Sequence, residues 1–133
     1  CKTPLARSLR DHLVVFSLPL DSMRVLRTPR IFISLGDLDA RGLDDEFHPS
    51  SIEVHPGTRS IVLLAAREEA MVELSQEGEI LATEEMKRRV HPQPEGLAFL
   101  PDGALVLADE GRDGPGTLTR YYGKKGDDGG RTP

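Results

Sequence analysis

Two adjacent carboxylates near the end of the chain, Asp109 and Glu110, stand directly before a glycine-rich stretch, Gly111–Gly116. Acidic pairs beside such a stretch can coordinate a cation or act as an acid and a base. They can equally be solvated loop residues whose oxygens accept hydrogen bonds from nearby backbone N–H groups. The glycine-rich stretch lacks the phosphate-loop pattern and does not open a helix, so we interpret it as a long hairpin.

The histidines do not have the spacing of a metal centre. His48, His55 and His91 each precede a proline, which favours extended or turn backbone. No pair among the four histidines of the chain has the spacing of a zinc-binding helix. We therefore expect structural roles for them. Ser50–Ser51 lacks the G-x-S-x-G context of a serine nucleophile.

A repeat with an offset of 45 residues organises the second half of the chain. Residues 48–56 align with residues 93–101, and their prolines and apolar positions coincide. Further matches follow after one residue of slippage: Ile61–Leu63 with Leu105–Leu107, and Met71–Leu74 with Leu118–Tyr121. A period of this length is typical of one four-stranded blade of a β-propeller.

Hydrophobic patterning predicts strands for these repeated stretches. Residues 52–54 alternate apolar and polar, which directs one face inward, and the apolar run 61–66 suits a strand covered on both faces. Turn-forming residues at 56–58 and 101–103 separate the first and second strands of each copy. Residues 65–75 have high helix propensity. The matching columns of the second copy hold glycines and a proline, so we expect strand, loop and strand there.

We divide the chain into four segments. Residues 1–36 are expected to supply the back half of a blade, with strands at His12–Leu18 and Arg30–Leu35, and residues 37–91 a second blade preceded by an acidic linker. Residues 92–122 form a last blade of three strands, and residues 123–133 are expected to be disordered. The sequence thus predicts an all-β, NHL/SMP30-like propeller fold of about two and a half four-stranded blades. This is an incomplete ring, because propellers have about 4–8 blades.

Composition narrows the function classes. Charged residues make up 29% and hydrophobic residues 38% of the 133 positions, which fits a soluble globular segment. The formal net charge of −5 argues against a nucleic-acid binder, which needs a basic face. No apolar run approaches the roughly 20 residues that span a bilayer, and no signal peptide is visible. We interpret Cys1 as the first residue of a truncated chain, with a lipidated cysteine as the alternative; a single cysteine excludes a cysteine-type zinc site.

Three strings carry a family resemblance: F-H-P-S-S-I-E-V-H-P, V-E-L-S-Q-E-G-E-I-L and Q-P-E-G-L-A-F-L-P-D-G-A-L-V-L-A-D-E-G. Together they resemble the SdiA-regulated (YjiK-like) family of bacterial β-propellers, and C-K-T-P followed by L-V-V-F-S-L is similar to the preceding blade of that family. The resemblance covers roughly residues 1–122. The P-E-G-x-A-F-x-P-D-G segment is shared with the wider NHL and SMP30-like propellers, so it is more specific for the fold than for the family. Family members have several more blades before the point where this chain begins.

The resemblance singles out Glu95, at the start of an inner strand where a blade meets the central channel. In SMP30-like propellers an acidic residue at that place can hold a divalent cation, and calcium takes about 6–8 oxygen ligands. The matching residue of the preceding copy is Ser50, so two adjacent blades offer one carboxylate. We name Glu95, Asp109 and Glu110 as candidate metal ligands, with calcium as the candidate cofactor. The alternative for Glu95 is to cap a turn or line a polar channel.

The function that the resemblance implies is a non-enzymatic binding or scaffold module, membrane-associated or extracytoplasmic, which means periplasmic or anchored to the cell membrane through a missing N-terminal segment. Its partner would be a protein or small-molecule ligand and not nucleic acid. The alternative is an SMP30-like metal-dependent hydrolase such as a lactonase. That function needs several ligands converging on the channel, and this chain supplies Glu95 with distant support from Glu53 or Asp109. We therefore expect no catalytic residues.

Overall fold

Three antiparallel sheets make up the computed structural model of this protein, which describes residues 7–43, 46–111 and 114–122. The first sheet has two strands, β1 (His12–Val15) and β2 (Ile31–Ser34). The second has four, β3 (Ser51–Val54), β4 (Ile61–Ala65), β5 (Ala70–Leu74) and β6 (Ile80–Glu85). The third has three, β7 (Pro94–Phe99), β8 (Leu105–Asp109) and β9 (Thr117–Tyr121). Within each sheet the strands pair in sequence order, so the two larger sheets are meanders, and the predicted all-β class is confirmed.

Helical structure in the described part of the chain is limited to η1 (Arg7–Leu9) and α1 (Leu35–Asp39). The Oγ atom of Ser34 accepts a hydrogen bond from the N–H of Gly36 at 3.2 Å and so caps α1. The strand predicted for Arg30–Leu35 therefore ends one residue earlier, at Ser34, and the helix begins at Leu35. The strand predicted for His12–Leu18 is also shorter and ends at Val15.

The segment with high helix propensity, residues 65–75, forms a turn followed by a strand. The turn at residues 66–69 ends at Glu69, which has a positive φ of 54°, and β5 begins at Ala70. The register of the repeat therefore predicted this segment correctly. The strand forms despite the helix propensity of its residues, because its packing between two sheets stabilises it by more free energy than the propensity costs.

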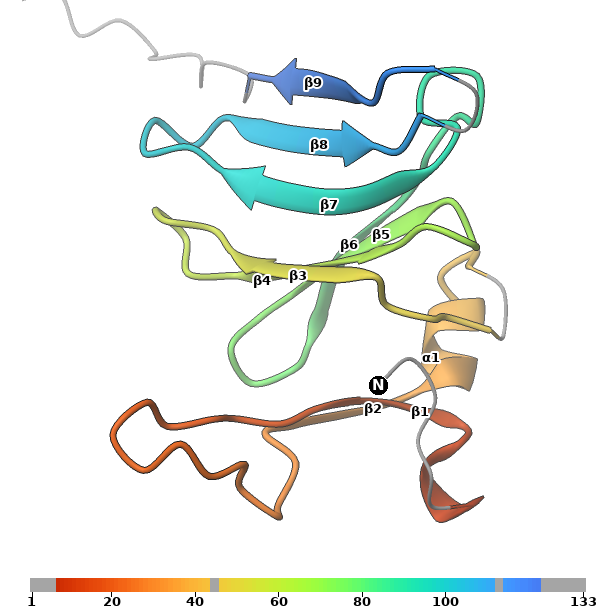
Figure 1. Cartoon of the computed structure of the whole chain (residues 1–133). Coiled ribbons are helices and arrows are strands. Elements are labelled where there is room, and N and C mark those ends of the chain that lie inside the picture. Colours follow the sequence, from red (N-terminus) through yellow and green to blue (C-terminus); the bar gives the residue numbers. More distant parts are fainter. Residues whose placement is uncertain (1–6, 44–45, 112–113, 123–133) are drawn as a thin grey trace, which may run out of the picture.

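The four-stranded sheet lies between the other two sheets, and its second strand, β4, is buried along its whole length (Figure 1). Successive side chains of a strand point to opposite faces of the sheet. Ile61, Leu63 and Ala65 therefore pack toward the first sheet, in a core that includes Ile31 and Leu38. The alternate residues of β4, Val62 and Leu64, pack toward Leu97 and Leu107 of the third sheet.

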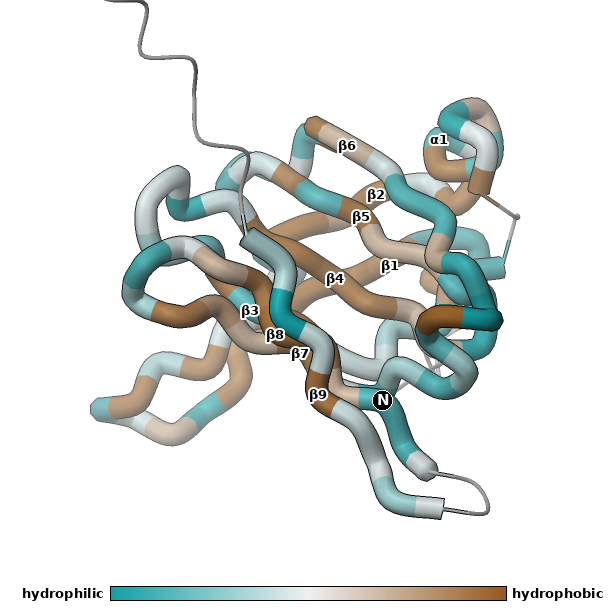
Figure 2. Tube along the Cα trace, turned by 90° about the horizontal axis from the view of Figure 1, so that it is seen from above, coloured by the Kyte–Doolittle hydropathy of each residue, from teal (hydrophilic) through white to brown (hydrophobic). Residues whose placement is uncertain are grey.

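The view from above shows the same layering in the hydropathy of the chain. Hydrophobic stretches follow β4, β7 and β8 through the middle of the molecule, and most turns at the periphery are hydrophilic (Figure 2). The continuous apolar run at residues 61–66 thus corresponds to a strand covered on both faces, as its pattern predicted.

One glycine fixes how the hairpin between β5 and β6 meets the first sheet. Gly78 has a φ of +93°, and a Cβ atom built on it would lie 3.0 Å from Cγ2 of Ile31. Next to this contact, Nη2 of Arg30 donates to Oε1 of Gln76 at 2.9 Å. The turn therefore needs glycine both for its backbone conformation and for its close approach to β2.

The first strands of the second and third sheets, β3 and β7, lie side by side, and the N–H of Leu97 donates to Oγ of Ser51 at 3.3 Å. The outer faces of the two end sheets are open in the described structure: Leu118 of β9 is 77% exposed and Phe32 of β2 is 52% exposed. The three sheets do not close into a ring. The predicted tail, residues 123–133, lies outside the described residues.

Candidate functional site

A buried pair of His91 and Asp109 joins the loop before β7 to the end of β8. Nδ1 of His91 lies 2.7 Å from Oδ2 of Asp109, and both side chains are at most 4% exposed. The second oxygen, Oδ1 of Asp109, accepts a hydrogen bond from the N–H of Gln93 at 3.2 Å. On its other side, Nε2 of His91 is hydrogen-bonded to the hydroxyl of Tyr121 in β9. The three side chains thus connect the β6–β7 loop to β8 and β9.

A second pair occupies the matching place in the four-stranded sheet. Nδ1 of His48, in the segment before β3, lies 2.7 Å from Oε1 of Glu68, in the turn between β4 and β5. The backbone N–H of His48 also donates to Oε2 of Glu68 at 3.1 Å. Each of the two sheets thus has a histidine–carboxylate pair between the segment before its first strand and the end of its second strand or the turn after it. The paired residues do not occupy the same positions of the repeat, because His48 aligns with Gln93 and Asp109 aligns with Ala65. His55, the third histidine before a proline, accepts hydrogen bonds from Gly57 N and Thr58 N in the β3–β4 turn.

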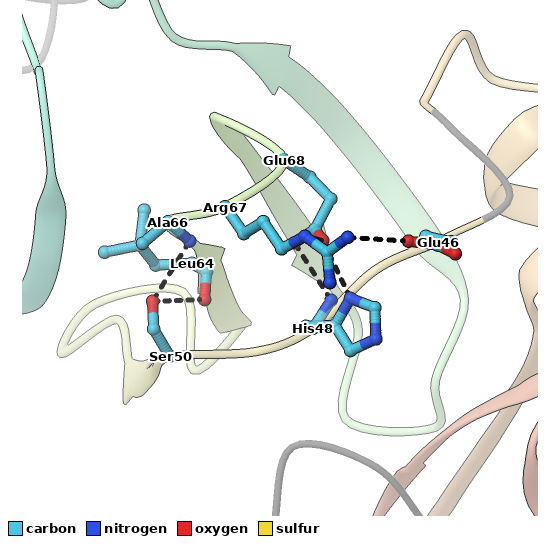
Figure 3. A network of polar contacts seen from close by, with 7 residues as sticks. All are labelled: Glu46, His48, Ser50, Leu64, Ala66, Arg67 and Glu68. Carbon is cyan, nitrogen blue, oxygen red and sulfur yellow. Dashed lines mark hydrogen bonds and ion pairs between the residues drawn. The ribbon is translucent and has the colours of Figure 1, made fainter.

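The pair of His48 and Glu68 belongs to a group that could hold a cation (Figure 3). One ligand atom each from Glu46, His48 and Glu68 lies within 4.8 Å of the other two. Phe47, which is 5% exposed, anchors the segment in the core. Residues two apart on an extended chain point to the same side, so Glu46 and His48 both face the turn that carries Glu68. In the described part of the chain, this is the one group of at least three His, Cys, Asp or Glu side chains that lie close enough together to bind a metal ion.

Arg67 is the nearest cation to this group, and its contacts are loose. Its Nη2 atom lies 3.5 Å from Oε2 of Glu46, and its Nε atom lies 3.9 Å from Oε1 of Glu68. Charge-assisted hydrogen bonds are usually about 2.7–2.9 Å long. The Arg67 side chain is also 74% exposed, whereas that of Glu68 is 7% exposed. Glu68 is therefore buried in the turn, whereas the side chains of Glu46, at 60% exposed, and Arg67 lie on its solvent side.

The structure places the predicted ligands Glu95, Asp109 and Glu110 in different surroundings. Asp109 is held by His91 and the backbone of Gln93, as described above. Oε2 of Glu110 accepts a hydrogen bond from Nε2 of Gln93 at 2.8 Å. Glu95 is exposed at a bulge of β7, where Pro94 pairs with Asp109 and Gly96 pairs with Ala108. Asp109 and Glu110 thus converge on Gln93, and a metal role for all three residues stays a prediction.

Sequence reasoning did not single out Glu46 and Glu68. The spacing of Glu46 and His48 was a usable signal, because an extended segment brings residues i and i+2 to one side. Glu68 carried no such signal. It follows His48 by 20 positions, and only the hairpin of β3, β4 and the next turn brings the two together.

No family model, no curated protein and no solved structure matches this chain. Within the described residues, no helix combines the length and the apolar character needed to cross a membrane.

Proposed function

We propose that this chain forms part of a β-propeller of the SdiA-regulated type, acting as a non-enzymatic binding or scaffold module that holds one divalent cation at Glu46, His48 and Glu68. The observation that supports the cation is the mutual proximity of one nitrogen and two carboxylate ligand atoms. The family and an extracytoplasmic or membrane-associated location follow from the sequence resemblance alone.

The layering of the sheets supports the propeller architecture. Two meanders with matching repeats stack face to face, with their first strands, β3 and β7, in contact. The third sheet has one strand fewer than the second, so the free edge of β9 is where a fourth strand would pair. The open faces of the first and third sheets would then pack against further blades of the same ring.

The donor set indicates which cation suits the site. Imidazole nitrogen and carboxylate oxygen are the ligands of zinc and related ions, whereas calcium takes oxygen ligands. Three protein ligands would leave a coordination position for water or a bound molecule. We therefore propose a zinc-like ion at Glu46, His48 and Glu68. Calcium remains the proposed ion for an all-oxygen site that includes Glu95.

A cation must displace Arg67 to enter. Its contacts with Glu46 and Glu68 are those of an exposed ion pair, and such pairs contribute only about 0–1 kcal/mol. A divalent ion also places two positive charges, in place of one, beside two carboxylates. Displacing the guanidinium therefore costs little free energy compared with the free energy that coordination of the ion by the three side chains contributes.

The test is a calorimetric titration with zinc chloride and, separately, calcium chloride, using Cys1→Ser protein so that no thiol competes. We expect one zinc ion per chain and at least about tenfold weaker binding in Glu46→Gln and Glu68→Gln. Glu77→Gln is the matched control, because Glu77 is exposed in the β5–β6 turn and lies outside the group. Equal zinc binding in all four proteins would refute the site.

The same proteins, together with Glu95→Ala, separate the scaffold from the hydrolase hypothesis. A scaffold shows no metal-dependent cleavage of a lactone. Zinc- or calcium-dependent lactone hydrolysis that disappears in Glu68→Gln or in Glu95→Ala would instead support the SMP30-like hydrolase.

A further inference from the structure

A cavity of about 370 Å³ lies between the four-stranded and the three-stranded sheet, close to the strand β9. Its walls are largely apolar and include Met71, Met86, Leu105 and Leu107. Binding pockets for small molecules have about this size, and they combine apolar walls with a few placed polar groups. Here the polar groups are His91 and Tyr121.

These two residues belong to a directed chain of hydrogen bonds. An ionised carboxylate only accepts hydrogen bonds, so Nδ1–H of His91 donates to Asp109. In the neutral imidazole Nε2 then accepts, and the hydroxyl of Tyr121 donates to it. The phenol oxygen keeps its lone pairs, and Tyr121 is 40% exposed. The cavity wall therefore presents a hydrogen-bond acceptor.

The rim of the cavity adds a charge preference. Glu84, Glu85 and Lys87 line it, so it carries two carboxylates and one ammonium group. This rim favours a neutral or cationic ligand over an anionic one. Near the other histidine, His48, the ligand atoms within 4.8 Å belong to Glu46 and Glu68.

We propose that this cavity binds a small apolar molecule that carries a hydroxyl group, and that the ligand O–H donates to the phenol oxygen of Tyr121, which His91 and Asp109 hold in place. This site is separate from the cation site and does not depend on it. It goes beyond the proposed scaffold function by assigning a ligand class to one location.

The probes are 4-ethylphenol and 4-ethylanisole, which share an apolar body but differ in the hydroxyl donor. Each is titrated into the full chain labelled with ¹⁵N, and amide chemical shifts are recorded. We expect 4-ethylphenol to shift the amides of Met71, Leu105 and Tyr121 and to bind about three- to tenfold more tightly than 4-ethylanisole. Equal affinities would overturn the proposal, as would the absence of shifts at these amides.

Two variants test the recognition and the location separately. Tyr121→Phe keeps the ring and should weaken 4-ethylphenol binding by about three- to tenfold, whereas Tyr122→Phe, in the neighbouring residue, should leave it unchanged. Val90→Trp fills the cavity from a residue that is 46% exposed, so it spares the core and should abolish binding of both probes. Unaltered binding in Val90→Trp, or in Tyr121→Phe, would contradict the proposed site.

Discussion

Nδ1 of His91 lies 2.7 Å from Oδ2 of Asp109, and the same 2.7 Å separates Nδ1 of His48 from Oε1 of Glu68 in the preceding copy of the repeat. In each copy the histidine lies before the first strand and the carboxylate lies at or just after the end of the second. The pair therefore joins the entry of a sheet to the turn beside it. The two copies differ in their third partner, which is Tyr121 in one and the group with Glu46 in the other.

Removal of Asp109 should destabilise the protein strongly. In Asp109→Ala, the buried Nδ1–H of His91 loses its acceptor, and we expect a loss of about 2–3 kcal/mol in the free energy of unfolding. Asp109→Asn keeps an acceptor oxygen and should cost less. Denaturant unfolding monitored by circular dichroism measures both. A loss below about 1 kcal/mol in Asp109→Ala would show that the pair does not stabilise this sheet.

The equivalent change in the pair of His48 and Glu68 should be milder. The side chain of His48 is 26% exposed, so water can replace part of its interaction with Glu68. We expect His48→Ala to lower the unfolding free energy by about 1 kcal/mol, well below the effect of His91→Ala in the same assay. Equal effects in the two variants would contradict the role that we assign to burial.

Two glycines allow backbone strain and close packing to be measured separately. Gly42 and Gly78 both have positive φ, but only Gly78 has a neighbour within reach of a new Cβ atom, Ile31 at 3.0 Å. Gly42→Ala should cost about 1–2 kcal/mol from the backbone alone. Gly78→Ala should cost at least about 1 kcal/mol more, because Ile31 must move. Thermal and denaturant unfolding of the two variants gives the difference, and equal costs would mean that the hairpin does not press on β2.

The open face of the third sheet should make the isolated chain associate. Leu118 is 77% exposed beside an unpaired strand edge, which is a site for intermolecular pairing. We expect sedimentation velocity to show concentration-dependent oligomers and Leu118→Lys to reduce them. Thr28→Lys adds the same charge at an exposed polar position and is the control. A monomeric wild-type chain at all concentrations would argue against the proposal that this face packs against a further blade.

Arg67 should weaken the binding of a cation at Glu46, His48 and Glu68 in the wild-type protein. Its guanidinium lies near two of the three proposed ligands, so Arg67→Ala removes a competing charge. We expect zinc to bind Arg67→Ala up to about fivefold more tightly than wild type, since an exposed ion pair contributes up to about 1 kcal/mol. Arg41→Ala is the control, because Arg41 lies outside the group. Weaker zinc binding in Arg67→Ala would mean that Arg67 supports the site.

The sequence predicted strands correctly where an apolar run or the repeat marked them. The buried strand β4 followed from an unbroken apolar run, and the strand–loop–strand structure of residues 65–75 followed from the repeat. Partnerships across the sheets did not follow. Asp109 was recognisable as a carboxylate beside a glycine-rich stretch, but its contact with His91, 18 residues earlier, depends on the bulge at Glu95 and on the path of the β6–β7 loop. Glu68 acquires its position from the β4–β5 turn in the same way.

The most direct test of the cation scaffold is a crystal structure of the protein soaked in zinc, with anomalous diffraction recorded at the zinc absorption edge. We predict an anomalous peak bound by Nδ1 of His48 and carboxylate oxygens of Glu46 and Glu68, with Arg67 displaced toward solvent. An empty position there, or a peak at Glu95, Asp109 and Glu110 instead, would contradict the assignment of the site.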